Sequence, residues 1–302
     1  MIAPYWSDDT VTLLLGDARE TLAAMPDGSV DCIVTSPPYY ALRSYGMDGQ
    51  YGQESTPAAY VETMRAMFAE ARRVLADDGS LWLNLADSYA WSQVPGGGLP
   101  DKNLIGIPWR TAFALQDDGW MLRNEIVWHQ TNAMPESMRD RLSRRHETLF
   151  LFTKSSKYLF DLDAIREPHA EKSLYQQQVA RTRRHDPGKA HAPGQKAQSG
   201  MAAGLRELNP KGANPGTVWP IATTRYAGAH FAVFPIDLPL RCIKAGCKPG
   251  GTVLDPFSGS GTTGAAARQL GRRYVGIDLN PAYHDLAIPR FAQGVIDFGT
   301  AS

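Results

Sequence analysis

The sequence predicts an α/β fold with a mostly parallel sheet, because short apolar runs alternate with amphipathic helical patterns along most of the chain. Two of these runs, Val11–Leu15 and Asp31–Thr35, end at turn residues, as buried parallel strands do. A third observation comes from residues 251–278, where a strand, a glycine-containing loop, a helix and a second strand follow one another. This order is typical of a β-α-β unit.

The elements between the second strand and residue 154 follow from the same two periodicities. Apolar residues recur at helical spacing over residues 60–75, after Thr56-Pro57 as a helix start and before Gly79 as a stop. The remaining elements predicted in this part are strands at 80–85, 124–128 and 147–152 and a helix at 108–116.

After Lys154 the pattern fades, and over residues 171–215 it is largely lost under Gln, Ala, Gly, Pro and basic residues. This composition predicts a mobile or loosely folded insertion. Regular structure resumes near Val218, and the predicted elements that follow are a helix at 238–245, a strand at 251–255, a helix at 262–270 and a strand at 274–278.

The composition is that of a globular protein, with 302 residues, 43% of them hydrophobic and 21% charged. Cys32, Cys242 and Cys247 form neither a disulfide framework nor a metal-ligand pattern, which indicates reduced thiols, a cytoplasmic protein and no metal. No apolar run suits a signal peptide or approaches the roughly 20 residues of a membrane span, so we expect no membrane partner.

The formal net charge is zero, but it conceals a basic stretch between residues 172 and 211. Its basic residues are Lys172, Arg181, Arg183, Arg184, Lys189, Lys196, Arg206 and Lys211. Only Asp186 and Glu207 oppose them there. Local charge of one sign is typical of a segment that contacts nucleic acid.

The glycine loop near the end of the chain has two interpretations. Gly259, Gly261 and Gly264 satisfy G-x-G-x-x-G, and Asp278 follows at about the ~20-residue spacing expected of a dinucleotide-binding unit. Taken alone, this pattern would favour a nicotinamide or flavin enzyme. The preceding Asp255-Pro256-Phe257 is unusual in a pyrophosphate-binding turn and favours a different ligand.

Two segments are informative together, namely Thr35-Ser36-Pro37-Pro38-Tyr39 and the loop from Asp255 to Thr263. They resemble the corresponding motifs of the beta class of S-adenosylmethionine-dependent DNA amino-methyltransferases. Their order, with the catalytic motif first, the cofactor motif last and a variable basic stretch between, is the order of that class. The resemblance extends through Asn132–Ser137, Arg145–Ser155 and Tyr158–Asp161.

The resemblance implies a Rossmann-like methyltransferase fold with a mostly parallel seven-stranded sheet and a DNA-recognition insertion. It divides the chain into a catalytic half at residues 1–153, a variable target-recognition insertion at 154–229 and a cofactor-binding half at 230–302. The family's enzymes belong to restriction-modification systems, act alone, or are encoded by phages or mobile elements, and the sequence leaves these roles open. The resemblance is compatible with a homodimer and with a cognate restriction endonuclease that acts as a separate protein.

The resemblance also implies that S-adenosylmethionine is the cofactor, S-adenosylhomocysteine the product, and that no metal takes part. The implied cofactor-binding residues are Asp17, Phe231, Phe234, Asp255, Pro256, Phe257, Ser258, Gly259, Ser260, Gly261, Thr262, Thr263 and Asp278. Asp278 would bind the ribose hydroxyls. Asp17 matches a family residue near the adenine ring, with a plain turn aspartate as the alternative, and Phe231 and Phe234 could equally be core aromatics.

The implied catalytic residues, Ser36, Pro37, Pro38 and Tyr39, suit the methylation of an aromatic amino group. The Ser36 hydroxyl and the Pro37 carbonyl can each accept one amino hydrogen, which localises the nitrogen lone pair. Consecutive prolines remove backbone donors and stiffen the loop, and Tyr39 would stack on the base. The target base must leave the duplex to reach this site.

The base is not fixed by the motif alone. In the family, Ser-Pro-Pro-Tyr mostly accompanies cytosine N4 transfer and Asp-Pro-Pro-Tyr usually accompanies adenine N6 transfer, so cytosine N4 is favoured and adenine N6 is the alternative. Methylation at cytosine carbon 5 needs a cysteine nucleophile, usually after proline, and none of the three cysteines follows one. A DNA-binding protein that has lost catalysis is a further alternative.

Double-stranded DNA is the expected partner, and the basic residues are the expected contacts. Arg181, Arg183 and Arg184 form the main predicted cluster, and Arg144 and Arg145 belong to a second basic group with Arg139 and Arg141.

Overall fold

The computed structural model describes residues 2–44, 46–92, 94, 96–184, 208–224 and 234–292, although the side chains of 178–184 and 292 are not described. The chain forms two compact units. Unit 1 comprises Met1–Asp161 and Thr217–Ser302, and unit 2 comprises Leu162–Gly216.

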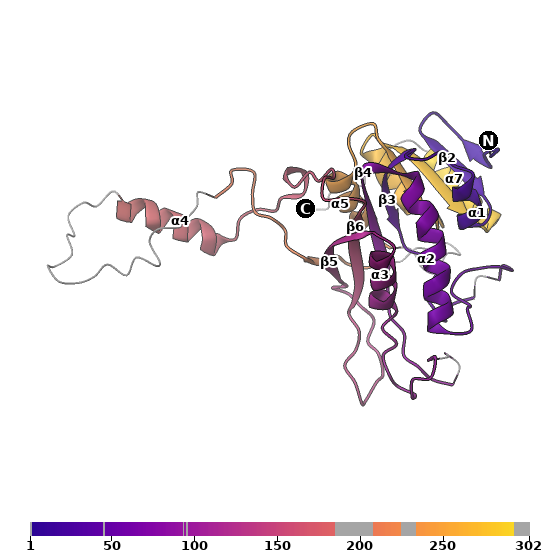
Figure 1. Ribbon diagram of the computed structural model, residues 1–302. Coiled ribbons are helices and arrows are strands. Elements are labelled where there is room, and N and C mark those ends of the chain that lie inside the picture. The colour runs from indigo at the N-terminus through magenta and orange to yellow at the C-terminus, as the bar shows by residue number, and fades with distance from the viewer. Residues whose placement is uncertain are drawn as a thin grey trace. The chain divides into compact units, whose positions relative to one another are not determined.

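Unit 1 is built on a sheet that has nine strands within the described ranges, in the order β1-β2-β9-β8-β3-β4-β6-β5-β7 (Figure 1). The strands are β1 (Trp6–Ser7), β2 (Val11–Leu15), β3 (Val30–Thr35), β4 (Leu75–Leu85), β5 (Met121–His129), β6 (His146–Thr153), β7 (Val218–Pro220), β8 (Thr252–Asp255) and β9 (Arg273–Asp278).

The sheet is mostly parallel, as predicted, but it has more strands than the seven expected. The pairings from β2 through β9, β8 and β3 to β4 are all parallel, whereas β6 is antiparallel to both β4 and β5. The additional strands lie at the two edges, where β1 has two residues and β7 has three. Strands this short are below the length at which an alternating apolar pattern can be recognised.

Helices of unit 1 form two rows. In the first row α1 packs against α2 and α2 against α3, and in the second α5 packs against α6 and α6 against α7. The bounds are α1 (Ala18–Ala23), α2 (Pro57–Val74), α3 (Ile107–Asp117), α5 (Asp237–Gly246), α6 (Thr262–Gln269) and α7 (Pro281–Ala292). Figure 1 shows α2 and α3 along the front of the sheet.

Alternation along β4 assigns the two rows to opposite faces of the sheet. Leu81 and Leu83 belong to the apolar cluster that also contains Met64 and Phe68 of α2. Ser80, which points to the other face, donates to the Gly246 carbonyl of α5 at 3.3 Å. Because successive strand residues point to opposite faces, helices cover the sheet on both sides.

The predicted helix over residues 60–75 is α2, and its start shows why it forms there. The Thr56 side chain accepts a hydrogen bond from the Ala59 backbone N–H, and Pro57 occupies the first turn, where its missing donor costs nothing. The helix ends at Val74, and the next residue, Leu75, already belongs to β4.

Unit 2 contains a short 3-10 helix (Asp163–Ile165) and α4 (Glu171–Arg184). Helix α4 lies where a loosely folded segment was expected. The helix was missed because its polar sequence has no apolar periodicity, and Leu174 and Tyr175 are 48% and 67% exposed. The expectation for residues 185–207 lies outside the described residues. Asp163 forms ion pairs with Arg166 at 2.6 Å and with Lys211 at 2.8 Å.

Within the described part of the chain, no helix combines the length and the apolar character needed to cross a membrane.

Candidate active site

The two sequence motifs meet because the strands that precede them are neighbours. Strands β3 and β8 are parallel, with Cys32 opposite Val253 and Ile33 opposite Leu254. Parallel strands end at the same edge of the sheet, so the segment from Ser36 to Tyr39 and the loop that follows Asp255 leave the sheet side by side.

A buried hydrogen-bond cluster ties the two motifs together at this edge. The Thr35 hydroxyl donates to Asp255 Oδ1 at 2.7 Å, and the Thr263 hydroxyl donates to Asp255 Oδ2 at 2.8 Å. The Phe257 backbone N–H also donates to Oδ1, at 3.1 Å. Burial raises the pKa of Asp255 to about 6, although all three donors oppose the shift. Asp255 therefore holds the loop, β3 and the first turn of α6 in one arrangement.

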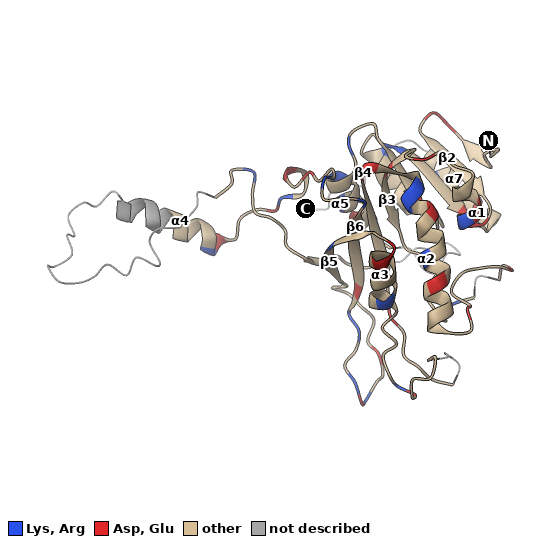
Figure 2. Cartoon of the chain, viewed as in Figure 1, with Lys and Arg blue, Asp and Glu red and all other residues tan. Residues whose placement is uncertain are grey.

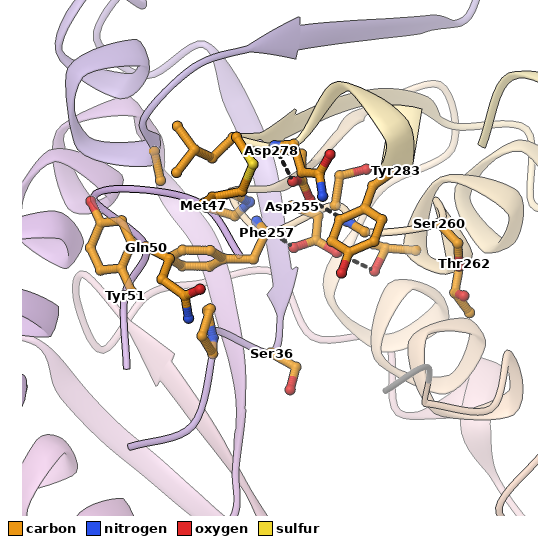
Figure 3. A pocket seen from close by; sticks show the side chains of 18 of the residues that line it. Ser36, Met47, Gln50, Tyr51, Asp255, Phe257, Ser260, Thr262, Asp278 and Tyr283 are labelled. Atoms are coloured by element: carbon orange, nitrogen blue, oxygen red, sulfur yellow. Dashed lines mark hydrogen bonds between the residues drawn. The ribbon is translucent and has the colours of Figure 1, made fainter. Parts of the chain in front are cut away.

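An open cavity of about 860 Å³, counting space that is open to solvent, lies at this edge. Figure 3 shows side chains from both halves of the chain around it, with Ser36 from the segment after β3 and Asp255 and Asp278 from the ends of β8 and β9. The predicted site residues that line it are Ser36, Pro38, Phe234, Asp255, Pro256, Phe257, Ser258, Gly259, Ser260, Thr262, Thr263 and Asp278.

Asp278 at the end of β9 holds the glycine loop in place. Its Oδ2 accepts from the Gly259 backbone N–H at 2.8 Å, and its Oδ1 accepts from the Asn280 N–H at 2.9 Å. Burial raises the pKa of this carboxyl group above its ordinary value. Gly261 begins α6 with a left-handed φ of 76°, and a Cβ there would lie 2.7 Å from the Phe291 ring, so only glycine fits without movement.

Four predicted site residues stand apart from the cavity lining, and a fifth is not described. Asp17 accepts from the Glu20 backbone N–H at 3.0 Å and caps α1, while its neighbours Gly16 and Ala18 line the cavity. The others absent from the lining are Gly261, Pro37 and Tyr39. Phe231 lies outside the described residues.

The cavity also has a wall that the motifs did not indicate. This wall consists of Met47, Gln50, Tyr51, Leu279, Asn280 and Tyr283. The Tyr51 ring meets the Phe257 ring edge to face, with centroids 5.2 Å apart. Burial, followed by the Asp17 carboxylate, raises the pKa of Tyr51. The sequence could have indicated only two of these wall residues, Leu279 and Asn280, because they directly follow the predicted site residue Asp278.

Ser36 and Tyr39 belong to a polar network beside the cavity. The Ser36 hydroxyl donates to the Tyr39 hydroxyl oxygen at 3.0 Å, and the Tyr39 hydroxyl donates to Glu147 Oε2 at 2.6 Å. The Tyr39 hydroxyl end lies in the interior, although the residue as a whole is partly exposed. Burial first, and then Glu147, raises the pKa of Tyr39 well above its ordinary value.

Two side-chain amides complete this network, and neither they nor Glu147 was identified from the sequence as a site residue. Asn84, at the end of β4, donates to the Tyr39 hydroxyl oxygen and to Glu147 Oε2, each at 2.7 Å. Gln130, after β5, donates to Glu147 Oε1 at 2.9 Å. Asn84 is 2% exposed, and its Oδ1 is one of the buried oxygens for which the described residues supply no donor. No motif marks these residues, because they meet only when β4, β5 and β6 pair.

The basic residues of the loop between β5 and β6 have different surroundings. Arg141 and Arg144 both pair with Glu136, at 2.6 and 3.4 Å, and Arg144 also donates to the Asp87 carbonyl. Arg145 is exposed, and its backbone carbonyl accepts from the Gln130 N–H at 2.8 Å. Figure 2 shows basic positions in the loops that extend beyond β5 and β6. The side chains of Arg181, Arg183 and Arg184 lie outside the described part.

Among the described residues, no group of three or more His, Cys, Asp and Glu side chains is arranged to hold a metal ion.

Comparison with known proteins agrees with this fold. The N6_N4_Mtase family model, described as DNA methylase, matches residues 30–289. The type II methyltransferase M.Cfr9I of Citrobacter freundii is 45% identical over 298 residues, which cover 92% of this chain and 87% of the relative.

Two solved structures share the fold. PvuII DNA methyltransferase (cytosine-N4-specific) superimposes with a TM-score of 0.67 at 19% identity, covering 99% of this chain and 90% of that one. A putative DNA modification methylase from Thermus thermophilus, complexed with S-adenosyl-L-methionine, has a TM-score of 0.57 at 24% identity, covering 95% of this chain and 96% of that one. The family match over residues 30–289 and the 45% identity to M.Cfr9I establish that the chain belongs to the DNA methylase family.

Proposed function

We propose that this protein transfers a methyl group from S-adenosylmethionine to the N4 amino group of a cytosine in a specific duplex DNA sequence. The observation that carries the proposal is that Ser36 of the Ser-Pro-Pro-Tyr segment lines the same cavity as the glycine loop and Asp278. A methyl donor held by the loop would therefore lie next to an acceptor for an amino hydrogen.

The residues that line the cavity suit S-adenosylmethionine in their chemistry. Phe257, Met47 and Leu279 supply apolar surface for a planar base and an aliphatic chain, and Asp278 supplies a carboxylate for ribose hydroxyls. The cofactor carries no phosphate, which agrees with the absence of any Lys or Arg from the described lining. When bound, it supplies an electrophilic methyl group on a sulfonium sulfur.

The segment after β3 supplies the acceptors for the base. The Ser36 hydroxyl is oriented by its bond to Tyr39, so a lone pair remains for one amino hydrogen of the base. The Pro37 carbonyl would accept the other. In-line transfer then needs no covalent enzyme intermediate, and the three cysteines within the described ranges are all buried.

Cytosine N4 is favoured over adenine N6 by Ser36 at the first motif position. PvuII DNA methyltransferase, whose fold this chain shares, carries the description cytosine-N4-specific. Transfer to adenine N6 by the same acceptors is the alternative.

DNA contact is assigned to two regions. Arg145 lies just before β6, two residues before Glu147, so a phosphate bound there would place the duplex beside the polar network. Arg181, Arg183 and Arg184 belong to the variable insertion, which we place at residues 154–229 between a catalytic half and a cofactor-binding half.

Type II relatives such as M.Cfr9I support a role in a restriction-modification system in the cytoplasm, with a cognate endonuclease as a separate protein.

The test is methyl transfer from tritiated S-adenosylmethionine to unmethylated duplex DNA of high sequence complexity. We expect incorporation with the purified full chain and a large loss with Ser36→Ala. Incorporation that is unaffected by Ser36→Ala would contradict the assigned acceptor. Cofactor binding without any incorporation would favour a DNA-binding protein that has lost catalysis.

A further inference from the structure

Methylation of an amino group leaves one proton to be removed, and the fate of that proton is not settled by the acceptor motif. The amino nitrogen exchanges one N–H bond for one N–CH3 bond, and the positive charge that the sulfonium loses leaves with a proton. Ser36 is neutral and cannot keep that proton, so a base must lie behind it.

The structure contains a continuous chain of donors behind Ser36. The Ser36 hydroxyl donates to the Tyr39 oxygen at 3.0 Å, and the Tyr39 hydroxyl donates to Glu147 Oε2 at 2.6 Å. The Tyr39 hydroxyl has a single proton, which it donates to the Glu147 carboxylate, so Ser36 is the donor in its bond with Tyr39. The direction is therefore the one in which a proton would have to move.

The surroundings of Glu147 suit a proton acceptor. Asn84 and Gln130 donate to its two oxygens at 2.7 and 2.9 Å, which fixes the carboxylate and leaves its charge to attract the proton. Glu147 is half-buried, so it can release the proton to solvent after each turnover. None of the hydrogen bonds that we describe for Glu147 comes from Lys or Arg.

We propose that Ser36, Tyr39 and Glu147 form a proton relay that discharges the methylated amino group, with Glu147 as its terminal acceptor. As the nitrogen bonds the methyl carbon, the N–H bond breaks and its proton passes to Ser36 Oγ. Ser36 passes its own proton to the Tyr39 oxygen, and Tyr39 passes its proton to Glu147 Oε2. The net result is a methylated amino group, a thioether and a neutral Glu147 carboxyl group, which then loses its proton to water.

The relay assigns two roles to Tyr39, since its ring can still stack on the base while its hydroxyl moves protons. Glu147 acts through Tyr39 and Ser36 and does not touch the base, so it is a positioning residue. The proposal rests on the proposed function, because it needs an amino group to be methylated beside Ser36.

The experiment measures single-turnover methyl transfer to a duplex DNA that the wild-type protein labels, in H2O and in D2O. Glu147→Gln keeps the size of the side chain and one acceptor oxygen but removes its charge and basicity, and Tyr39→Phe keeps the ring but removes the hydroxyl. Each change is expected to slow transfer by about 100-fold, the usual scale of general acid-base catalysis. Glu147→Asp is expected to recover part of the rate.

Two further readouts separate a relay from a loss of packing. The double variant is expected to be no slower than the slower single variant, because one relay cannot be broken twice. The solvent isotope effect of the wild-type protein is expected to fall in both single variants. Glu125→Gln makes the same chemical change at an exposed position of β5 and serves as the matched control.

A wild-type rate in Glu147→Gln, multiplying losses in the double variant, or an unchanged isotope effect in both single variants would overturn the relay. These outcomes leave the proposed function standing, because the wild-type protein still labels DNA. If the wild-type protein labels no DNA, it is the proposed function that fails. Binding of S-adenosylhomocysteine by each variant shows that the cavity is intact.

Discussion

The hydroxyl of Thr35, the last residue of β3, donates a 2.7 Å hydrogen bond to the carboxylate of Asp255, the last residue of β8. These residues are 220 positions apart in the sequence. The bond joins the acceptor segment and the glycine loop at the point where both leave the sheet. The proposed geometry of methyl transfer therefore depends on a buried carboxyl group at the boundary between the two motifs.

Asp255 is expected to make stability depend on pH. Its pKa rises from 3.8 to about 6 on folding, so the stabilisation it contributes is fully present below pH 3.8 and is lost as the pH rises through 6. This pKa difference corresponds to a loss of about 3 kcal/mol. In Asp255→Asn that loss is absent, so relative to the wild type the variant should gain about 3 kcal/mol between pH 4 and pH 7.

Urea unfolding of both proteins across this range measures the difference. Asp9→Asn, at an exposed position, is the control and should run parallel to the wild type. Parallel profiles for Asp255→Asn and the wild type would show that folding leaves the pKa of Asp255 unchanged.

Ser36→Ala and Tyr39→Ala are each expected to lower turnover by about 100-fold or more, because both remove groups that act on the amino group of the base. The affinity for S-adenosylhomocysteine should hardly change, since the glycine loop and Asp278 remain intact. Steady-state kinetics with calorimetry of cofactor binding separates the two effects. Ser156→Ala, at an exposed position, is the matched control, and an equal loss of cofactor affinity would mean that the two halves of the site are wrongly assigned.

Asp278→Asn is expected to weaken cofactor binding by roughly 10- to 100-fold, because a hydrogen bond from a ribose hydroxyl to a charged acceptor is worth about 1.5–3 kcal/mol. The asparagine oxygen can still accept from the Gly259 N–H, so the glycine loop should keep this contact, whereas the bond from the Asn280 N–H is lost. Calorimetric titration with S-adenosylhomocysteine measures the change. Asp117→Asn, exposed on α3, should bind as the wild type does, and an unchanged affinity in Asp278→Asn would remove Asp278 from the ribose site.

Arg145→Gln is expected to weaken DNA binding and to lower the slope of log affinity against log salt concentration by about 1, as expected for the loss of one phosphate contact. Cofactor affinity should not change. Arg273→Gln, exposed at the start of β9, is the control, because that end of the strand lies opposite the cavity edge. A salt slope that is the same in Arg145→Gln and the wild type would show that Arg145 makes no phosphate contact.

Much of the fold was predictable, because the central strands are long apolar runs that end at turn residues. Strands β3 and β8 and helices α2 and α6 were predicted to within a few residues. The edge strand β1 and helix α4 were missed for one reason, which is that neither buries a recognisable apolar face.

The candidate site was predictable where the sequence resembles the family's motifs, which includes the separate residues Phe234 and Asp278. Ser36 belongs to one continuous motif and the loop from Asp255 to Thr263 forms another, and both motifs contribute residues to one cavity. Glu147, Asn84 and Gln130 come from three different strand ends and give no local pattern. Their association requires the register of β4, β6 and β5, which the sequence does not reveal by itself.

The central claim is tested most directly by mass spectrometry of nucleosides from unmethylated DNA incubated with the full chain and isotopically labelled S-adenosylmethionine. The account predicts labelled N4-methylcytosine, and Ser36→Ala should abolish most of it. Labelled N6-methyladenine would keep the acceptor site but contradict the assignment of the base. The absence of any labelled base, with cofactor and DNA both bound, would contradict the account of a methyl-transferring site.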